Sequence, residues 1–220
     1  MMEPEARWIG QEIIKLCEAH PESVLLNVGS STAEFRKTSQ PVLNLEIFDP
    51  LQKLGVDVIH NDLKEDEGVD FVGDICEAEL LNLLKSKNIN IVLCSNLLEH
   101  VEQPQNICSA MQQICQKPGY VVASVPFRFP YHNDPIDTMF RPTPEQIQAL
   151  FPGSQMMASR IVEVESSYFS MLKRNRRERF RLLIRIFTPF YKFHNWKKIV
   201  SYLPKMFQKI AVSCAVLKIE

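Results

Sequence analysis

The stretch from Asn90 to Pro142 constrains the fold more than any other part of the chain. An apolar run from Ile89 to Cys94 is too short for a helix and rich in β-branched residues, which predicts a buried strand. A helical pattern follows from Gln105 to Gln116, and the segment Lys117 to Gly119 ends it with Pro and Gly. A second apolar run, Tyr120 to Val125, comes next. This order predicts a βαβ unit of a parallel sheet.

Ligands of open parallel sheets bind beyond the carboxyl ends of the strands. Each strand of the βαβ unit is followed there by an unusual polar cluster, Ser95 to His100 after the first and Tyr131 to Asp137 after the second. We therefore expect functional side chains in both clusters.

The rest of the chain adds elements of the same two kinds. Apolar residues at helical spacing predict helices, and short apolar or alternating runs predict strands. Helices are expected over Pro4–Ala19 and Glu77–Lys87 and from Thr143 onward. Further strands are expected over Ser23–Val28, Val42–Phe48, Val69–Val72, Arg160–Glu165 and Lys209–Glu220. The total is seven strands, and alternation in the last two predicts an antiparallel pair at the edge of the sheet.

The composition suits one α/β domain over residues 1–220. The chain is 45% hydrophobic with a net charge of −1, so as a whole it lacks the basic character of a nucleic-acid-binding protein. Its six cysteines show no CxxC spacing, which predicts reduced thiols in a cytoplasmic protein rather than disulfides or a zinc site. Residues 1–20 read as an amphipathic helix and not as a signal peptide, and no apolar run reaches the roughly 20 residues of a membrane span.

Several stretches together resemble the class I S-adenosylmethionine-dependent methyltransferases. The resemblance covers Ser23 to Gly153 and, loosely, the last strand; it is carried by VLLNVGSS, NLEIF, VDFVGDI, IVLCSNLLEHV, QKPGYVVASVPF and YHNDPIDTMFRPTPEQI. The last of these resembles a bacterial subgroup of the methyltransferase type 11 kind. The resemblance implies a Rossmann-like, seven-stranded, mostly parallel sheet with an antiparallel last strand and helices on both faces. It also implies S-adenosylmethionine as the cofactor.

A nucleoside cofactor needs a glycine turn, a carboxylate for its ribose and a polar group at its adenine edge. Gly29 offers the turn, and Glu46, at the end of the second expected strand, offers the carboxylate. By resemblance, Asp74 and Ile75 meet the adenine, while the methionine part lies against the Gly29 turn and the end of the fourth strand. The expected cofactor-binding residues are Gly29, Ser30, Ser31, Glu46, Ile47, Asp74, Ile75, Ser95 and Asn96.

The first turn departs from the methyltransferase pattern. Asn27 stands where an acidic residue is usual, and one glycine replaces a Gly-x-Gly-x-Gly run, so no ion pair with the cofactor ammonium can form there. The segment from Gly29 to Pro41 is barely long enough for a crossover helix, which predicts a turn instead. A binding module that kept the fold and lost the chemistry is therefore the competing hypothesis, with Glu46 solvated and Asp74 capping a turn.

The loop between Pro130 and Pro142 holds the candidates for contact with the methyl acceptor. His132 can take a proton near neutral pH, and Asp137 can orient it. Asp134 and Arg141 are expected to bind the acceptor. The alternative is that His132 and Asp137 only hydrogen-bond the loop to itself.

Glu99 and His100 resemble part of the Glu-x-x-Glu-His metal motif of some ubiquinone-pathway O-methyltransferases. Asn96 occupies the first position, so one ligand is missing and we expect no metal site. On this interpretation Glu99 or His100 orders the entrance to the following helix.

A basic, aromatic segment precedes the last strand. Residues 171–198 contain ten Lys and Arg against one acid, Glu178, a net charge of +9. Aromatic residues alternate with the charges, and we expect a helical insert over 171–205. Such a segment is typical of peripheral contact with the inner face of an anionic membrane, or of a lid over an anionic or lipid-linked substrate. The alternative is an ordinary helical insert with a solvated basic face. Binding of nucleic acid fits the segment less well.

The resemblance and the polar clusters together predict methyl transfer to an oxygen or nitrogen of a small, sugar-linked or lipid-linked acceptor.

Overall fold

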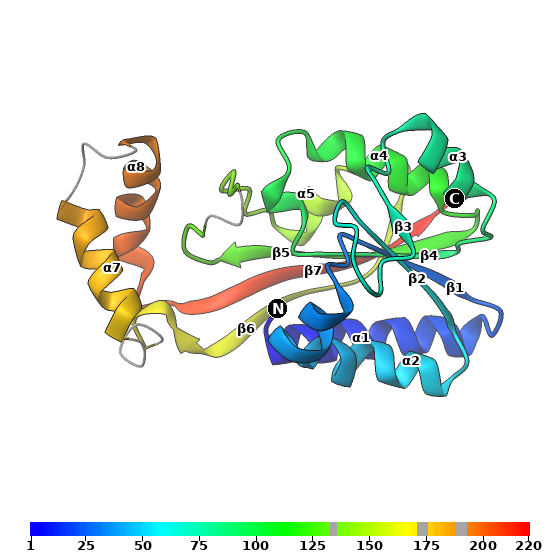
Figure 1. Ribbon diagram of the computed structural model, residues 1–220, viewed down its shortest axis with the longest axis horizontal. Coiled ribbons are helices and arrows are strands. Elements are labelled where there is room, and N and C mark those ends of the chain that lie inside the picture. The colour runs from blue at the N-terminus through cyan, green and yellow to red at the C-terminus, as the bar shows by residue number, and fades with distance from the viewer. Residues whose placement is uncertain (133–135, 171–175, 188–192) are drawn as a thin grey trace.

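The computed structural model describes residues 1–132, 136–170, 176–187 and 193–220. One mixed sheet runs through the molecule in the order β3-β2-β1-β4-β5-β7-β6 (Figure 1). Its strands are β1 Val24–Val28, β2 Asp57–Asp62, β3 Phe71–Val72, β4 Ile91–Ser95, β5 Gly119–Arg128, β6 Gln155–Ser167 and β7 Lys209–Ile219. The first five pair in parallel, and β7 lies antiparallel between β5 and β6. The predicted fold class is confirmed.

Helices cover both faces of this sheet (Figure 1). One face carries α1 Glu3–Ala19, the one-turn helix η2 Asn44–Phe48 and α2 Asp49–Lys53. The other carries α3 Ala78–Lys85, α4 Pro104–Ile114 and α5 Pro144–Gln148. Successive side chains of a strand point to opposite faces, so Leu25 packs with the α1 layer and Leu26 with the α4 layer. Each such fully buried side chain contributes about 1.5–3 kcal/mol.

The expected second strand is wrong. Residues 44–48 are helical, and in and around them the buried positions Leu43, Ile47 and Leu51 are four residues apart, close to the period of a helix. The second strand of the sheet is β2, which the sequence analysis missed. The crossover from β1 to β2 therefore extends well past Pro41 and includes η1 Phe35–Ser39, η2 and α2.

Other elements differ mainly at their ends. The third expected strand shortens to Phe71–Val72, and the expected Arg160–Glu165 strand lengthens to Gln155–Ser167. The helix expected from Thr143 begins with a capping box, in which the Thr143 hydroxyl accepts a hydrogen bond from the Gln146 amide at 3.3 Å.

The insert is helical where the structure describes it. Helices α7 Arg176–Phe187 and α8 Phe193–Tyr202, followed by η4 Leu203–Lys205, stand beyond the ends of β6 and β7, away from the helices that cover the sheet (Figure 1). The Trp196 indole donates a hydrogen bond to the Ile186 carbonyl at 2.9 Å and so joins the two helices. Among the described residues, no helix has the length and apolar character needed to cross a membrane. Residues 171–175 and 188–192 of the insert lie outside the described residues.

Close packing between α1 and η2 generates a stability prediction. A Cβ on Gly10 would lie 1.9 Å from the Glu46 carbonyl oxygen, so Gly10→Ala forces the two backbones apart. We expect the variant to lose at least about 2 kcal/mol of unfolding free energy in urea titrations, despite the gain of about 1 kcal/mol in helix propensity. Gln11→Ala, at an exposed position of the same helix, should change stability by less than about 0.5 kcal/mol. Equal unfolding midpoints for the two variants would contradict the packing.

Candidate active site at the carboxyl ends of the strands

The turn after β1 is held in place by a buried arginine. Arg36, 5% exposed, donates hydrogen bonds to the carbonyls of Ser30 at 3.1 Å, Ser31 at 2.6 Å and Gly68 at 2.7 Å. Gly29 has φ +69°, and a Cβ on it would lie 3.0 Å from a methyl carbon of Leu97. A larger residue would therefore be strained at this turn and would press on the Leu97 side chain of the loop after β4.

Asp62, at the end of β2, is the carboxylate that the sequence analysis missed. Its Oδ2 accepts a hydrogen bond from the Ser31 amide at 2.7 Å, which brings the ends of β1 and β2 together. Its Oδ1 accepts one from the Lys64 amide at 3.0 Å. The signal in the sequence was the β-branched pair of Val58 and Ile59, followed by His-Asn-Asp.

The premise for Glu46 and Ile47 as cofactor residues is wrong, because no strand ends there. Glu46 lies in η2 and accepts a hydrogen bond from Arg7 of α1 at 3.3 Å. Ile47 is fully buried in the core under α1. Both residues serve the packing of η2 on α1, as the helical spacing of this segment dictates.

Asp74 and Ile75 lie where β3 leads into α3. The Asp74 side chain accepts a hydrogen bond from the Cys76 amide at 2.9 Å, and its carbonyl accepts one from Glu77 at 2.9 Å. Asp74 thus orders the turn before α3, and Ile75 is 2% exposed in the core. Contact of these residues with an adenine stays a prediction.

The end of β4 is joined to the amino-terminal helix. Asn96, at φ +50°, and Ser124 of β5 each donate a side-chain hydrogen bond of 2.7 Å to the Glu5 carboxylate, which is 1% exposed. Ser95 pairs with Ser124 in the sheet. No local sequence pattern pointed to Glu5, because it comes from α1 and meets β4 and β5 only in the folded chain.

The loop after β5 folds around Asp137. This carboxylate, 1% exposed, accepts hydrogen bonds from the His132 amide at 2.9 Å and the Arg141 guanidinium at 2.7 Å. Burial opposes ionisation, but the bonds from His132 and Arg141 hold the pKa of Asp137 well below its ordinary value. Arg141 also donates to the carbonyls of Phe129 and Pro130 at 3.3 and 3.4 Å. These bonds tie the loop to itself, and contact with an acceptor stays a prediction.

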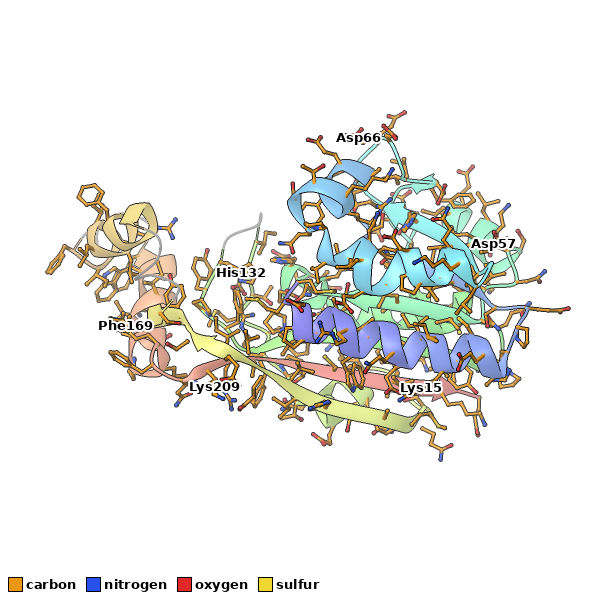
Figure 2. All side chains as sticks on the ribbon, turned by 90° about the horizontal axis from the view of Figure 1, so that it is seen from below. Lys15, Asp57, Asp66, His132, Phe169 and Lys209 are labelled. Atoms are coloured by element: carbon orange, nitrogen blue, oxygen red, sulfur yellow. The ribbon has the colours of Figure 1, made fainter. Side chains whose placement is uncertain are left out.

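Three side chains with metal-ligating atoms meet beside this loop. Ligand atoms of Glu99, His100 and His132 all lie within 4.8 Å of one another. Glu99, in the short helix η3 Leu98–His100, is fully buried, and burial raises its pKa to about 7. Figure 2 shows His132 between the sheet and the helices of the insert.

Asp134, the remaining expected acceptor residue, lies outside the described residues.

Asn27, the residue that replaces the usual acid on β1, is already paired. Its amide donates a hydrogen bond to His60 Nδ1 at 3.2 Å. Burial, and to a lesser extent the charge of Arg36, lower the pKa of His60 to about 4, although Asp70 opposes the shift. The neutral ring is therefore the form that accepts from Asn27.

This shift generates a prediction for pH. The folded pKa of His60 lies below its ordinary value of 6.5, so its contribution to stability is complete above about pH 6.5 and is lost as the pH falls toward 4. Between pH 7.5 and 4.5 the loss should be about 2–3 kcal/mol. Urea unfolding of His60→Gln should show a smaller difference between the two pH values than the wild type. His20→Gln, at an exposed site, should keep the wild-type difference; equal pH dependence in both variants would contradict the assignment.

Comparison with known proteins bears on this architecture. No family model matches the sequence, and no curated protein matches it either. Among solved structures, the MccD protein aligns over 99% of both chains with 16% identity and a TM-score of 0.57. A candidate sarcosine dimethylglycine methyltransferase from Galdieria sulphuraria aligns over 97% of this chain and 84% of its own, with 10% identity and a TM-score of 0.59.

A candidate methyltransferase from Bacillus halodurans is similar over 95% of this chain and 99% of its own, with 12% identity and a TM-score of 0.56. These identities are low, so the likeness concerns the fold. The alignments span the whole sheet, including the antiparallel strands at its edge. The fold of this chain is that of the class I methyltransferases.

Proposed function

We propose that this protein transfers a methyl group from S-adenosylmethionine to an oxygen or nitrogen of an acceptor. The observation that carries the proposal is the meeting of Asp62 with the turn from Gly29 to Ser31, at the carboxyl ends of β1 and β2. In open α/β sheets the ligand lies at the point where the strand order reverses, here between β1 and β4. We place the cofactor there.

The residues at the ends of β1 and β2 fit the nucleoside half of that cofactor. Each Asp62 oxygen accepts one backbone hydrogen bond and has a further lone pair for a ribose hydroxyl. Hydrogen bonds to a charged group contribute about 1.5–3 kcal/mol each. Ser30, Ser31 and Asn96 would hold the methionine part, with Asp74 and Ile75 near the adenine. When bound, the cofactor supplies the electrophilic methyl group.

We propose that His132 faces the acceptor. Its Nδ1 lies 3.3 Å from Asp137 Oδ2, which fixes the ring and leaves Nε2 as the nitrogen for a partner. Burial lowers the pKa of His132, but its bond to Asp137 outweighs this effect, and the net shift is upward. Tyr131 and Arg185 of α7 line one small hollow beside this loop, so the insert lies next to the loop that we propose for the acceptor.

A cofactor-free binding module is the second candidate. The methyl carbons of Leu97 lie 3.0 and 3.1 Å from the Cβ position of Gly29, so Leu97 covers part of the turn. Asn27, bonded to His60, offers no charge for the cofactor ammonium. One fold hosts many activities, so binding has to be measured.

Asp62→Asn separates the two candidates. The amide oxygen can still accept from Ser31, but the negative charge is lost, and the ribose and the Lys64 amide lose an acceptor. We expect calorimetry to show a wild-type complex with S-adenosylmethionine and an affinity about 10- to 100-fold lower in the variant. Asp57→Asn, at the other end of β2, is the matched control and should bind like the wild type (Figure 2).

Glu46→Gln should also bind the cofactor like the wild type, because Glu46 faces Arg7 and not the strand ends. An absence of wild-type binding at millimolar cofactor would favour the binding module. Equal affinity of the Asp62 and Asp57 variants would show that the cofactor lies elsewhere.

We further propose that the acceptor is anionic or lipid-linked and that the insert contacts an anionic membrane surface. Phe180, Leu183 and Phe187 of α7 are 66%, 53% and 78% exposed. Residues 171–198 carry a net charge of +9. Exposed apolar side chains beside basic ones are typical of helices that lie in a membrane interface.

Flotation with liposomes tests this contact. The variant with Arg176, Arg177, Arg179 and Arg181 changed to glutamine should lose most of its binding to anionic vesicles, since each basic residue contributes about 1 kcal/mol near such a surface. The control changes the exposed residues Lys15, Lys53, Lys64 and Lys85, and thus the same net charge, and should float like the wild type. Equal recovery of the wild type and the arginine variant would end the membrane proposal.

A further inference from the structure

Glu99, His100 and His132 come together because β4 and β5 are neighbouring parallel strands. Ser95 pairs with Ser124, so the segments that follow both strands leave the sheet side by side. Glu99 and His100 belong to the first segment and His132 to the second. Thr138 of the β5 loop fixes this arrangement, since its amide and hydroxyl donate to the Glu99 carbonyl at 2.9 and 3.0 Å.

The Glu99 carboxylate lacks the hydrogen-bond donors that usually surround a buried acid. It is fully buried, and among the described residues neither carboxylate oxygen has a hydrogen-bond donor. His100 Nε2 lies 3.6 Å from Oε1, too far for a hydrogen bond. Leaving a buried polar group unpaired costs about 1–3 kcal/mol, and more when it is charged. A bound cation would remove this cost.

Both histidines are oriented as metal ligands usually are. His100 Nδ1 donates to the Ile136 carbonyl. His132 Nδ1 lies 3.3 Å from Asp137 Oδ2 and 3.4 Å from the Pro130 carbonyl. Because these partners only accept, each ring carries its proton on Nδ1 and leaves Nε2 for a ligand. Metal-binding histidines almost always donate their other N–H to a carboxylate or carbonyl in this way.

We propose that Glu99, His100 and His132 bind a divalent transition-metal ion of the zinc type. Two imidazoles and one carboxylate suit zinc or cobalt better than magnesium or calcium, which take oxygen ligands. With metal–ligand distances of about 2.0–2.2 Å, ligand atoms in a tetrahedral site lie about 3.4 Å apart. The separation of 3.6 Å between Glu99 and His100 matches this spacing, and the ligand atom of His132 lies within 4.8 Å of both.

The expectation of no metal site rested on Asn96, which stands where a third ligand would precede Glu99. In the folded chain the Asn96 amide is bonded to Glu5, and His132 supplies the third ligand from another segment. Three protein ligands leave a coordination position open, as in catalytic zinc sites. With its Nε2 on the ion, His132 could not take the acceptor's proton, and the ion would activate the acceptor instead.

Titration with cobalt tests the site without S-adenosylmethionine, so its outcome is independent of the cofactor experiment. The full chain without a histidine tag is treated with EDTA, dialysed and titrated with Co²⁺, whose visible absorption reports coordination by nitrogen and oxygen. Zinc is then added to displace it. We expect one equivalent of Co²⁺ to bind and Zn²⁺ to bind more tightly, while a large excess of Mg²⁺ displaces neither.

Glu99→Gln, His100→Gln and His132→Gln should each weaken Co²⁺ binding by about 10- to 100-fold or more. His20→Gln is the matched control. His20 follows α1 and is hydrogen-bonded to Tyr120 at the start of β5, which is the end of the strand away from the proposed metal site. Circular dichroism of the metal-free variants checks that each has folded, and the more exposed His100 and His132 variants decide the result if Glu99→Gln does not fold. Absence of stoichiometric binding to the wild type, or wild-type affinity in any folded ligand variant, would overturn the proposal.

Discussion

The parallel alignment of β1, β2, β4 and β5 is the constraint on which the candidate site depends. The carboxyl ends of neighbouring parallel strands lie at the same end of the sheet. The segments that follow these strands therefore meet there, however far apart they lie in the sequence. The meeting of Asp62 with Ser31, of Asn96 with Ser124 and of Glu99 with His132 all follow from this alignment. The antiparallel edge of β7 and β6 extends the sheet and carries the insert beyond it.

Two buried carboxylates near the carboxyl ends of β4 and β5 differ in the hydrogen bonds that they accept. Glu5 accepts hydrogen bonds from the Met2 amide, Asn96 and Ser124. Glu99 has no such donors among the described residues. A carboxylate that is fully hydrogen-bonded stabilises the arrangement around it, whereas one without donors marks a place for a proton or a cation. This contrast is the physical reason for treating Glu5 as structural and Glu99 as functional.

The sequence predicted the strands whose residues are apolar and buried on both faces, such as β4 and β5. It missed β2, because Asp57–Asp62 is half polar and its outer neighbour, the two-residue β3, covers little of it. It assigned Val42–Phe48 to a strand because the helical period becomes visible only when Leu51 is included. The expected role of Glu46 as the ribose carboxylate rested on that strand assignment. The partners of Glu5 lie 91 and 119 residues along the chain, beyond any local pattern.

Because Glu5 reaches the ends of β4 and β5 from the first turn of α1, the start of the chain is part of the site's architecture. The last residue of β7, Ile219, instead pairs with Gly119, the first residue of β5, at the opposite end of that strand from the site. A substitution that shifts the first turn of α1 should therefore displace Asn96, whereas one at the end of β7 acts far from this contact.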